Sequence, residues 1–438
     1  MKKIIVAPEA LLQEVFGEKA RIIARESGFV QRQRKLDPVL FARTFCLSLL
    51  GSAAVSLVSL GLDVAVTASA LCQQFRKTTS VEYFRRLLQL TLCELDRAAN
   101  PPKTNIPIFS RFRGVYLADG TTLMLPECLA ERFPGYGGGA GATDSRASAA
   151  VKILLRYRLD CPGDVSVLLA GARTPDKTML ASMSRLEAGA LLITDLGFFD
   201  GERFAEMERQ GCFWLTRLPA MLSLQADGGE WTELVDLLDR LEKLGVRQHE
   251  VTSTMSKKAP FRGRVVLQRC PEAVAAGRRR RALQKCKGVA PGRRKLMLCD
   301  WWTAATNAPE GLMSAKEATN LYRSRWQIEL VFKRWKSLGR LAIDAKHSQN
   351  RAECELYARL MGVLLVDHLA GSRGGSLSGK SMWLAWEQAL KLIPMILLAL
   401  RGLIAWEVVR MEWDRLSKAR PRQSRRKKRP STRQTLYQ

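Results

Sequence analysis

The sequence contains few of the residues on which many catalytic and structural sites depend. Only three histidines occur, and none lies near a serine or cysteine in a recognisable nucleophile motif. The ten cysteines are scattered singly, without the two-residue spacing that zinc sites favour. We therefore expect reduced thiols rather than a zinc site, and carboxylates become the groups to examine for catalysis.

Long, uninterrupted apolar runs are also missing. The most apolar window, Cys46 to Leu71, is broken by serines, glycines and Asp63, and a second window, Leu390 to Val409, holds two cations and a proline. The N-terminus meets Pro8 and Glu9 before a signal-peptide core can form. We expect both windows to be buried helices, with no membrane partner and a cytoplasmic location.

Acidic residues are scarce relative to basic ones. The chain has 70 lysines and arginines against 42 aspartates and glutamates, a net charge of +28. This excess is tolerated most easily by a protein that works against a polyanion, and nucleic acid is the favoured one. The last stretch, Lys418 to Gln438, is basic without any acid and is predicted to be a disordered tail.

The remaining pattern predicts a mixed α/β chain. Residues up to about Asn100 have helical periodicity, whereas short strand-like runs begin at Val115 and include a hairpin, a buried strand, a helix and a further strand. Pro219 to Asn307 is irregular, with strand-like pieces at 262–269 and 295–302. Helical periodicity returns from Ala315 to Leu338 and again from Ala352 to Ala370.

Two aspartates stand where an apolar strand is expected to end. Asp119 follows Val115–Ala118, and Asp195 follows a buried run that ends at Thr194. Such a carboxylate is held rigidly at the rim of a sheet, as a divalent ion requires of its ligands. Aspartates at strand ends also begin ordinary turns, and for either residue alone that reading is the stronger one.

A third carboxylate changes this balance. Tyr322, Arg325, Glu329 and Lys336 fall on one stripe of a predicted helix, so that a phenol and two cations flank one acid. The arrangement is consistent with a solvated face of ion pairs. A surface that faces phosphate beside one metal ligand explains the tyrosine and arginine better.

These four residues resemble the YREK signature of bacterial insertion-sequence DDE transposases of the IS-four type. Tyr322, Arg325, Glu329 and Lys336 have the signature's spacings of two, three and six intervening residues. The Asp119-Gly120-Thr121 segment and the segment from Thr194 to Phe199 resemble the family's two catalytic aspartate motifs. The resemblance extends over about residues 114–365.

The resemblance implies a ribonuclease-H-like catalytic core interrupted by a mainly β insertion domain, with an N-terminal helical domain and C-terminal helices. The gap from Asp195 to Glu329 is long enough to hold the insertion. The predicted parts are a helical domain with possible DNA-end recognition at 1–100, the first part of the core at 101–218, the insertion at 219–307, the second part of the core with the C-terminal helices at 308–416, and the tail at 417–438.

The implied chemistry is cleavage of double-stranded DNA at transposon ends and strand transfer into target DNA. Asp119, Asp195 and Glu329 are the expected catalytic residues and ligands of Mg²⁺, for which Mn²⁺ can substitute. Tyr322, Arg325 and Lys336 are the expected DNA contacts, and so is Trp301 or Trp302, as the tryptophan that stacks on a flipped base.

By the same resemblance the protein is bacterial and associated with the nucleoid, and it works as a homodimer on DNA. Two alternatives remain open from the residues: a DNA-binding protein derived from a transposase that no longer cleaves, and a related nuclease without strand transfer.

Overall fold

The protein is described by a computed structural model that covers residues 8–32, 35–52, 54–99, 106–136, 148–161, 163–226, 228–284, 291–343, 347–372, 381–419 and 431–437. The chain forms two compact units, and each is made of segments that are distant in sequence. The first unit holds residues 1–104, 120–175 and 326–434. The second holds 105–119, 176–325 and 435–438.

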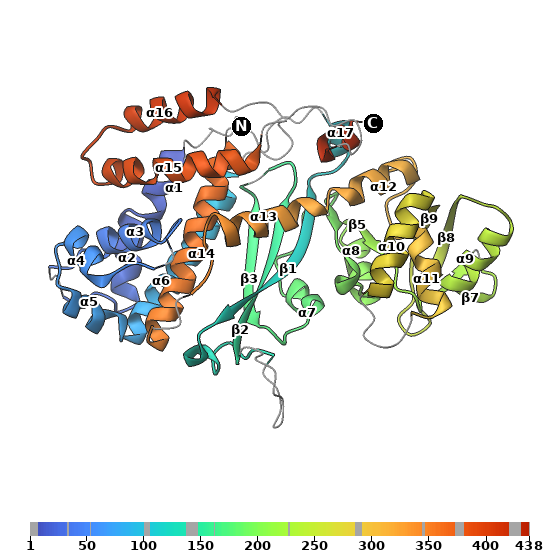
Figure 1. Cartoon of the computed structure of the whole chain (residues 1–438), viewed down its shortest axis with the longest axis horizontal. Helices are drawn as coiled ribbons and strands as arrows, with labels where there is room; N and C mark the ends of the chain where they lie inside the picture. Colours follow the sequence, from blue (N-terminus) through green and yellow to red (C-terminus); the bar gives the residue numbers. More distant parts are fainter. Residues whose placement is uncertain are drawn as a thin grey trace. The chain divides into compact units, whose positions relative to one another are not determined.

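Six N-terminal helices of the first unit confirm the helical texture expected there (Figure 1). They are α1 (Pro8–Val15), α2 (Glu18–Glu26), α3 (Pro38–Ser48), α4 (Leu57–Val64), α5 (Ala68–Phe75) and α6 (Thr78–Ala98). Aromatic side chains fill their core. Phe29 stacks on Tyr83 at 4.5 Å between ring centroids, and the Tyr83 hydroxyl donates to the Pro38 carbonyl at 3.0 Å. This bond satisfies the only polar atom of a fully buried ring.

The rest of the first unit consists of a β-hairpin and long helices. The hairpin pairs β2 (Ala149–Arg158) antiparallel with β3 (Val165–Gly171), as the sequence predicts. The helices are α13 (Trp326–Ser337), α14 (Gln349–Ser372), α15 (Met382–Leu400), α16 (Trp406–Lys418) and most of α17 (Thr432–Leu436). The buried α14 lies along α6, and the two lie side by side in Figure 1.

The second unit is built on strands, and β1 (Val115–Leu125) runs from it into the first unit. The complete strand order is β3-β2-β1-β4-β5-β10-β9-β8-β6-β7. The further strands are β4 (Leu191–Ile193), β5 (Phe213–Arg217), β6 (Ser223–Ala226), β7 (Trp231–Glu233), β8 (Gln248–Met255), β9 (Phe261–Arg269) and β10 (Trp301–Thr306). β4 pairs in parallel with β1 on one side and with β5 on the other, whereas the strands beyond β5 pair antiparallel.

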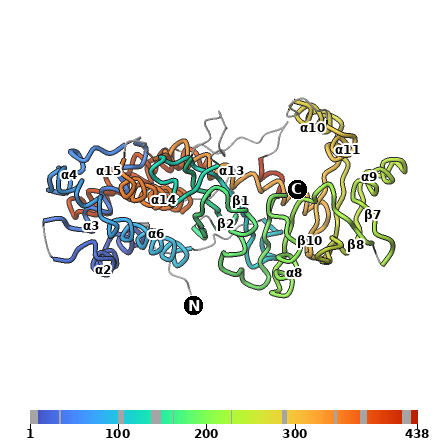
Figure 2. The backbone as a smooth tube through the Cα atoms, turned by 90° about the horizontal axis from the view of Figure 1, so that it is seen from below, coloured from blue at the N-terminus to red at the C-terminus, as the bar shows by residue number. Residues whose placement is uncertain are grey.

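Helices and short 3₁₀ turns complete the second unit, and Figure 2 labels several of these helices. They are η1 (Pro107–Arg111), α7 (Asp176–Ala181), η3 (Leu196–Phe198), α8 (Gly201–Arg209), α9 (Leu234–Lys243), α10 (Glu272–Gln284), α11 (Arg293–Asp300) and α12 (Ala315–Arg323), and one further turn, η2 (Glu127–Leu129), belongs to the first unit. Phe204 of α8 stacks on Trp214 of β5 at 4.5 Å, which joins helix and sheet.

Two expectations about the 219–307 region are wrong. The strand predicted at 295–302 is mostly the helix α11, and only its last two residues belong to β10. The region is also less β-rich than expected, because three helices, α9, α10 and α11, lie among its strands. Lys295 to Asp300 mixes charged and apolar residues without strict alternation, so local pattern did not distinguish helix from strand.

The apolar windows are divided among separate helices. Cys46–Leu71 is split over α3, α4 and α5, and α4 and α5 meet at 105°. Leu390–Val409 is split between α15 and α16. Among the described residues, α15 alone is a single helix long and apolar enough to cross a membrane, and 39% of that window is buried inside the protein.

The prediction of a disordered tail needs correction at its end. Residues 420–430 and 438 lie outside the described part, but 432–436 form α17. Ser431 begins this helix through a reciprocal pair of bonds with Gln434, whose amide N–H donates to the Ser431 hydroxyl at 3.3 Å. The Thr432 hydroxyl also bonds the Gln327 side chain at 2.7 Å.

Candidate active site

Three charged residues follow the carboxyl ends of the parallel strand pairs in the second unit. Leu117 of β1 pairs with Ile193 of β4, and Ile193 pairs with Leu215 of β5. Two residues beyond this row come Asp119, Asp195 and Arg217. Parallel strands present equivalent positions at one edge, so the three residues are placed in one row by backbone register alone.

Asp195 is fixed by its own turn. It is the residue that caps η3, and its Oδ1 accepts a hydrogen bond from the Gly197 amide at 2.8 Å. A Cβ at Gly197 would come within 3.2 Å of that oxygen, so glycine allows the backbone to close around the carboxylate. The Asp195 carboxylate is therefore held in a defined position by its own turn.

Asp119 forms an ion pair with Arg325. The Arg325 Nη1 donates to Asp119 Oδ2 at 3.1 Å, and both side chains are 18% exposed. Asp119 does not end its strand, as had been expected, because the threonines and leucines after Gly120 continue β1 to Leu125. Only the pairing with β4 ends before it, at Leu117.

Tyr322 lies in the same neighbourhood. Burial raises the pKa of Tyr322 to about 12, against the opposing effect of the Arg217 and Arg325 cations. The phenol therefore stays protonated at neutral pH and can act as a hydrogen-bond donor toward an anion. Burial lowers the pKa of Arg217, which still leaves this guanidinium charged.

The predicted single helical stripe is wrong. Tyr322 belongs to α12 and Glu329 to α13, and the helix breaks at Ser324 and Arg325 between them. The buried Ser324 hydroxyl donates to the Leu321 carbonyl at 2.5 Å, which offers the backbone an alternative to helix continuation. The four signature residues thus project from two helices and the link between them.

Polar contacts, one of them from a buried arginine, hold α12 in place within the second unit. Ser314 and Glu317 form a reciprocal capping box at its start, and Arg111 pairs with Glu317 at 3.0 Å. Arg264 is buried, pairs with Glu250 and donates to the Ala308 carbonyl at 3.2 Å. The loop that leads into α12 is therefore held at both ends. These contacts fix the position of α12 and, with it, of Tyr322.

Glu329 and Lys336 belong to the first unit, on α13. Lys336 Nζ donates to the Thr121 hydroxyl at 2.6 Å and to the Thr122 carbonyl at 3.1 Å. Partial desolvation by these neighbours lowers the pKa of Lys336. Because side chains alternate along a strand, Thr121 and Asp119 lie on the same face of β1.

The rear of α13 is held by a buried ion pair. Arg334 Nη2 lies 3.3 Å from Asp367 Oδ1, and the side chains are 5% and 3% exposed. Trp386 Nε1 donates to the same oxygen at 2.7 Å. At the end of α13, a Cβ on Gly339 would lie 2.5 Å from Val363, so α13 and α14 approach too closely for any other residue.

Neither tryptophan singled out for base stacking presents an exposed ring. Trp301 is fully buried and Trp302 is 7% exposed, both in β10. Trp302 contacts Tyr322 edge to face at 6.0 Å between ring centroids. Stacking on a flipped base stays a prediction, and the contact with Tyr322 makes Trp302 the better candidate of the two.

The residues present suit a hard divalent ion in part. Asp119 and Asp195 are oxygen donors that follow adjacent parallel strands, which is the ligand chemistry of Mg²⁺. Within the ranges that the structure describes, no group of three or more His, Cys, Asp and Glu side chains is arranged to hold a metal. Glu329 belongs to the other unit, so convergence of the three carboxylates stays a prediction.

Arg217 was missed by the sequence reasoning. It is a half-buried cation that ends β5 in the row of the two aspartates. A signal was available, since Arg217 closes an otherwise apolar strand after Asp195. Recognising it required knowledge that β4 and β5 are parallel neighbours, which no local pattern provides.

Residues 110–365 match the family model of the transposase DDE domain. The chain is 26% identical to the transposase for insertion sequence element IS231B of Bacillus thuringiensis subsp. berliner, over 78% of this chain and 75% of that protein. It is 23% identical to the transposase for insertion sequence element IS1151 of Clostridium perfringens, over 78% and 76% of the two chains.

Proposed function

Because the chain belongs to the transposase DDE domain family, we propose that it is an insertion-sequence DNA transposase of the IS-four type whose metal-holding carboxylates are Asp119, Asp195 and Glu329. It cleaves DNA strands at the ends of its element and transfers them into target DNA. The observation that carries the residue assignment is the row of Asp119 and Asp195 on adjacent parallel strands.

Contacts of α13 support Glu329 as the third carboxylate. Lys336 bonds Thr121, which shares a face of β1 with Asp119. Glu329 lies two helical turns before Lys336 and so shares its face of α13. The YREK spacing and this contact independently favour the same glutamate.

The residues have distinct roles in this proposal. A bound Mg²⁺ or Mn²⁺ supplies the charge that activates water or a 3′-hydroxyl and stabilises the leaving oxygen. Asp119, Asp195 and Glu329 hold it. Arg325, Arg217 and the protonated Tyr322 offer hydrogen-bond donors to phosphate oxygens, with Arg325 exchanging its carboxylate partner for DNA. The nucleophile comes from water or DNA, so no side chain forms a covalent intermediate.

The proposal includes a homodimer on paired transposon ends and a cytoplasmic, nucleoid-associated location. N-terminal residues 1–100 are assigned to DNA-end recognition, and the flanking assignments of core, insertion and tail keep the boundaries given above.

An assay with the full chain, labelled duplexes that carry the element's ends, a target plasmid and Mg²⁺ tests the proposal. We expect both cleaved ends and joined products. Asp195→Asn should lose both, whereas Glu310→Gln, at an exposed position, should retain them. Cleavage without joining would identify a nuclease instead, and binding without cleavage would identify a transposase-derived DNA-binding protein.

A further inference from the structure

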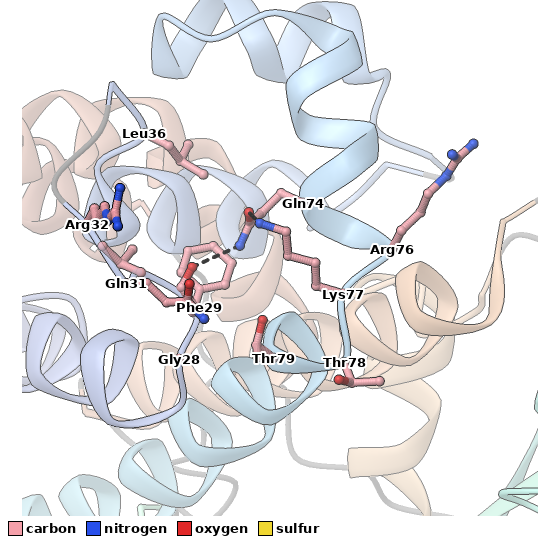
Figure 3. A pocket seen from close by; sticks show the side chains of 11 residues that line it. Gly28, Phe29, Gln31, Arg32, Leu36, Gln74, Arg76, Lys77, Thr78 and Thr79 are labelled. Carbon is pink, nitrogen blue, oxygen red and sulfur yellow. Dashed lines mark hydrogen bonds between the residues drawn. The ribbon is translucent and has the colours of Figure 1, made fainter.

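A pocket of about 650 Å³ lies within the first unit, between the loop that follows α2 and the start of α6 (Figure 3). The Gln74 side-chain amide donates to the Phe29 carbonyl at 3.1 Å and joins the two walls. Gly28 has a φ of +70°, and a Cβ there would lie 3.4 Å from the Thr79 methyl group. The walls are therefore held by specific contacts.

Three cations and no acid line this pocket. They are Arg32, Arg76 and Lys77. None of them forms an ion pair with an acid among the residues that the structure describes, and Lys77 donates to the neutral Gln74 oxygen at 2.9 Å. The arginines of α6 itself differ, because Arg85, Arg86 and Arg97 each pair with a glutamate. The pocket thus has uncompensated positive charge.

The start of α6 adds to this charge. The helix has 21 residues, its capping residue Lys77 makes no side-chain capping bond, and no acid occurs in its first turn. The first amide groups of a helix lack intrahelical acceptors and carry the positive end of the helix dipole. Thr78 and Thr79, which follow Lys77, also line the pocket. An anion there would receive backbone donors as well as cations.

A second pocket of about 530 Å³ adjoins the first and shares Arg32 with it. It adds the cations Arg21, Arg25 and Lys35. Its single acid, Asp37, is already engaged, because it accepts from the Leu40 amide at 2.8 Å and pairs with Arg21 at 3.2 Å. We call the two pockets together the basic groove.

We propose that the basic groove binds the sugar–phosphate backbone of duplex DNA without reading its bases. The identification of the polyanion as DNA rests on the proposed function. Two adjoining cationic pockets suit successive phosphates, whereas the one aromatic side chain in the lining, Phe29, is 4% exposed and cannot stack on unpaired bases.

Salt-dependent binding by the full chain tests the basic groove. Arg32→Ala/Arg76→Ala/Lys77→Ala should lower affinity equally for a labelled end duplex and an unrelated duplex. It should also reduce the slope of log affinity against log salt by about 3, at roughly 0.9 per phosphate contact. The control Arg85→Ala/Arg86→Ala/Arg97→Ala removes the same number of cations from α6, outside the groove, and should change the slope by less than about 1. Equal changes in the two triple variants would overturn the proposal.

Lys77→Asp separates binding from folding. Aspartate is a favourable capping residue and suits the helix dipole, so this variant should raise the melting temperature. It also puts a negative charge into the basic groove and should weaken DNA binding several-fold. A raised melting temperature with unchanged affinity would refute the groove. All of these binding measurements are made in EDTA and do not depend on cleavage. Failure of the wild-type protein to cleave DNA in the separate Mg²⁺ assay would therefore count against the proposed function and leave the groove unaffected.

Discussion

The carboxylates of the two units are placed by different means. In the second unit, Asp119 and Asp195 follow adjacent parallel strands and gain their positions from backbone register. In the first unit, Glu329 is carried by a short helix that is fixed through side chains, with Lys336 bonded to β1 on one side and Arg334 paired with Asp367 on the other.

This difference has consequences for sensitivity to mutation. Backbone hydrogen bonds of a sheet do not depend on any one side chain. Most substitutions of neighbouring residues should therefore leave the positions of the two aspartates unchanged. The orientation of α13 depends on a few buried polar groups. Removing one partner of such a pair lowers the free energy of unfolding strongly, because the other partner stays buried without its acceptor or donor. In the proposed site, we expect the position of the two strand-borne aspartates to be robust and that of the helix-borne Glu329 to be sensitive to distant substitutions.

The largest expected effect tests whether the helix-borne carboxylate is equivalent to the strand-borne ones. Glu329→Gln keeps the shape of the side chain but removes a metal-ligand charge, so Mg²⁺-dependent strand cleavage should fall by about three orders of magnitude, corresponding to several kcal/mol. Asp195→Asn should have a similar effect. Gel quantification of cleaved ends measures both rates, and DNA binding should persist in each. Normal cleavage by Glu329→Gln would show that the assigned active site is wrong.

The next effect concerns the support of α13. Asp367→Ala leaves the buried Arg334 charge and the Trp386 N–H without their acceptor, and it should cost about 3–5 kcal/mol of unfolding free energy. Chemical denaturation measures this loss. Glu412 pairs at the surface of α16 with the exposed Arg415, and removing its carboxylate should leave the denaturation midpoint nearly unchanged. A small effect of Asp367→Ala would mean that α13 is held by other contacts.

A smaller effect is expected at the link between α12 and α13. Arg325→Ala should weaken engagement of the cleaved end by about 1.5–3 kcal/mol while the protein stays folded, because its pair with Asp119 is partly exposed. Arg325→Lys should restore the charge but not the forked geometry, and so recover only part of the affinity. Fluorescence anisotropy with a pre-cleaved end measures both. Loss of folded protein in Arg325→Ala would assign the residue to structure rather than to DNA.

The smallest effect distinguishes the units by pH. In the first unit, burial lowers the pKa of His368 to about 4, below the value of 6.5 for an unburied histidine. The folded protein should therefore keep its full stability above pH 6.5 and lose stability as the pH falls toward 4, because the unfolded chain binds the proton more readily. In the second unit, the raised pKa of Tyr322 should contribute stability below pH 10 that is lost as the pH rises toward 12.

Melting temperatures measured across these two ranges provide the check. His368→Gln should flatten only the acid side of the profile, and Tyr322→Phe only the alkaline side. If either substitution flattened both sides, the two titrations would not be local to their residues.

The sequence predicted most of the individual elements. Helical periodicity up to about Asn100 agrees with α1 to α6, and the hairpin of β2 and β3, the short strand before Asp195 and the following helix, α8, were all anticipated. Errors arose where local pattern was ambiguous. The predicted 315–338 helix is interrupted at Ser324 and Arg325, where the Ser324 hydroxyl bonds the Leu321 carbonyl. Lys295 to Asp300 forms a helix where a strand had been predicted.

The sequence by itself determined the basic character of the chain, the scarcity of histidine and the fixed spacing of Tyr322, Arg325, Glu329 and Lys336, because these are properties of residue order. Only the tertiary structure decided which strands are parallel neighbours, and with that the row that adds Arg217 to the two aspartates. It also decided that Trp301 is buried and that Arg32, Arg76 and Lys77 of the basic groove have no acidic partner in the described part of the chain. Pairing and burial depend on residues brought together from distant parts of the chain, so no local pattern can specify them.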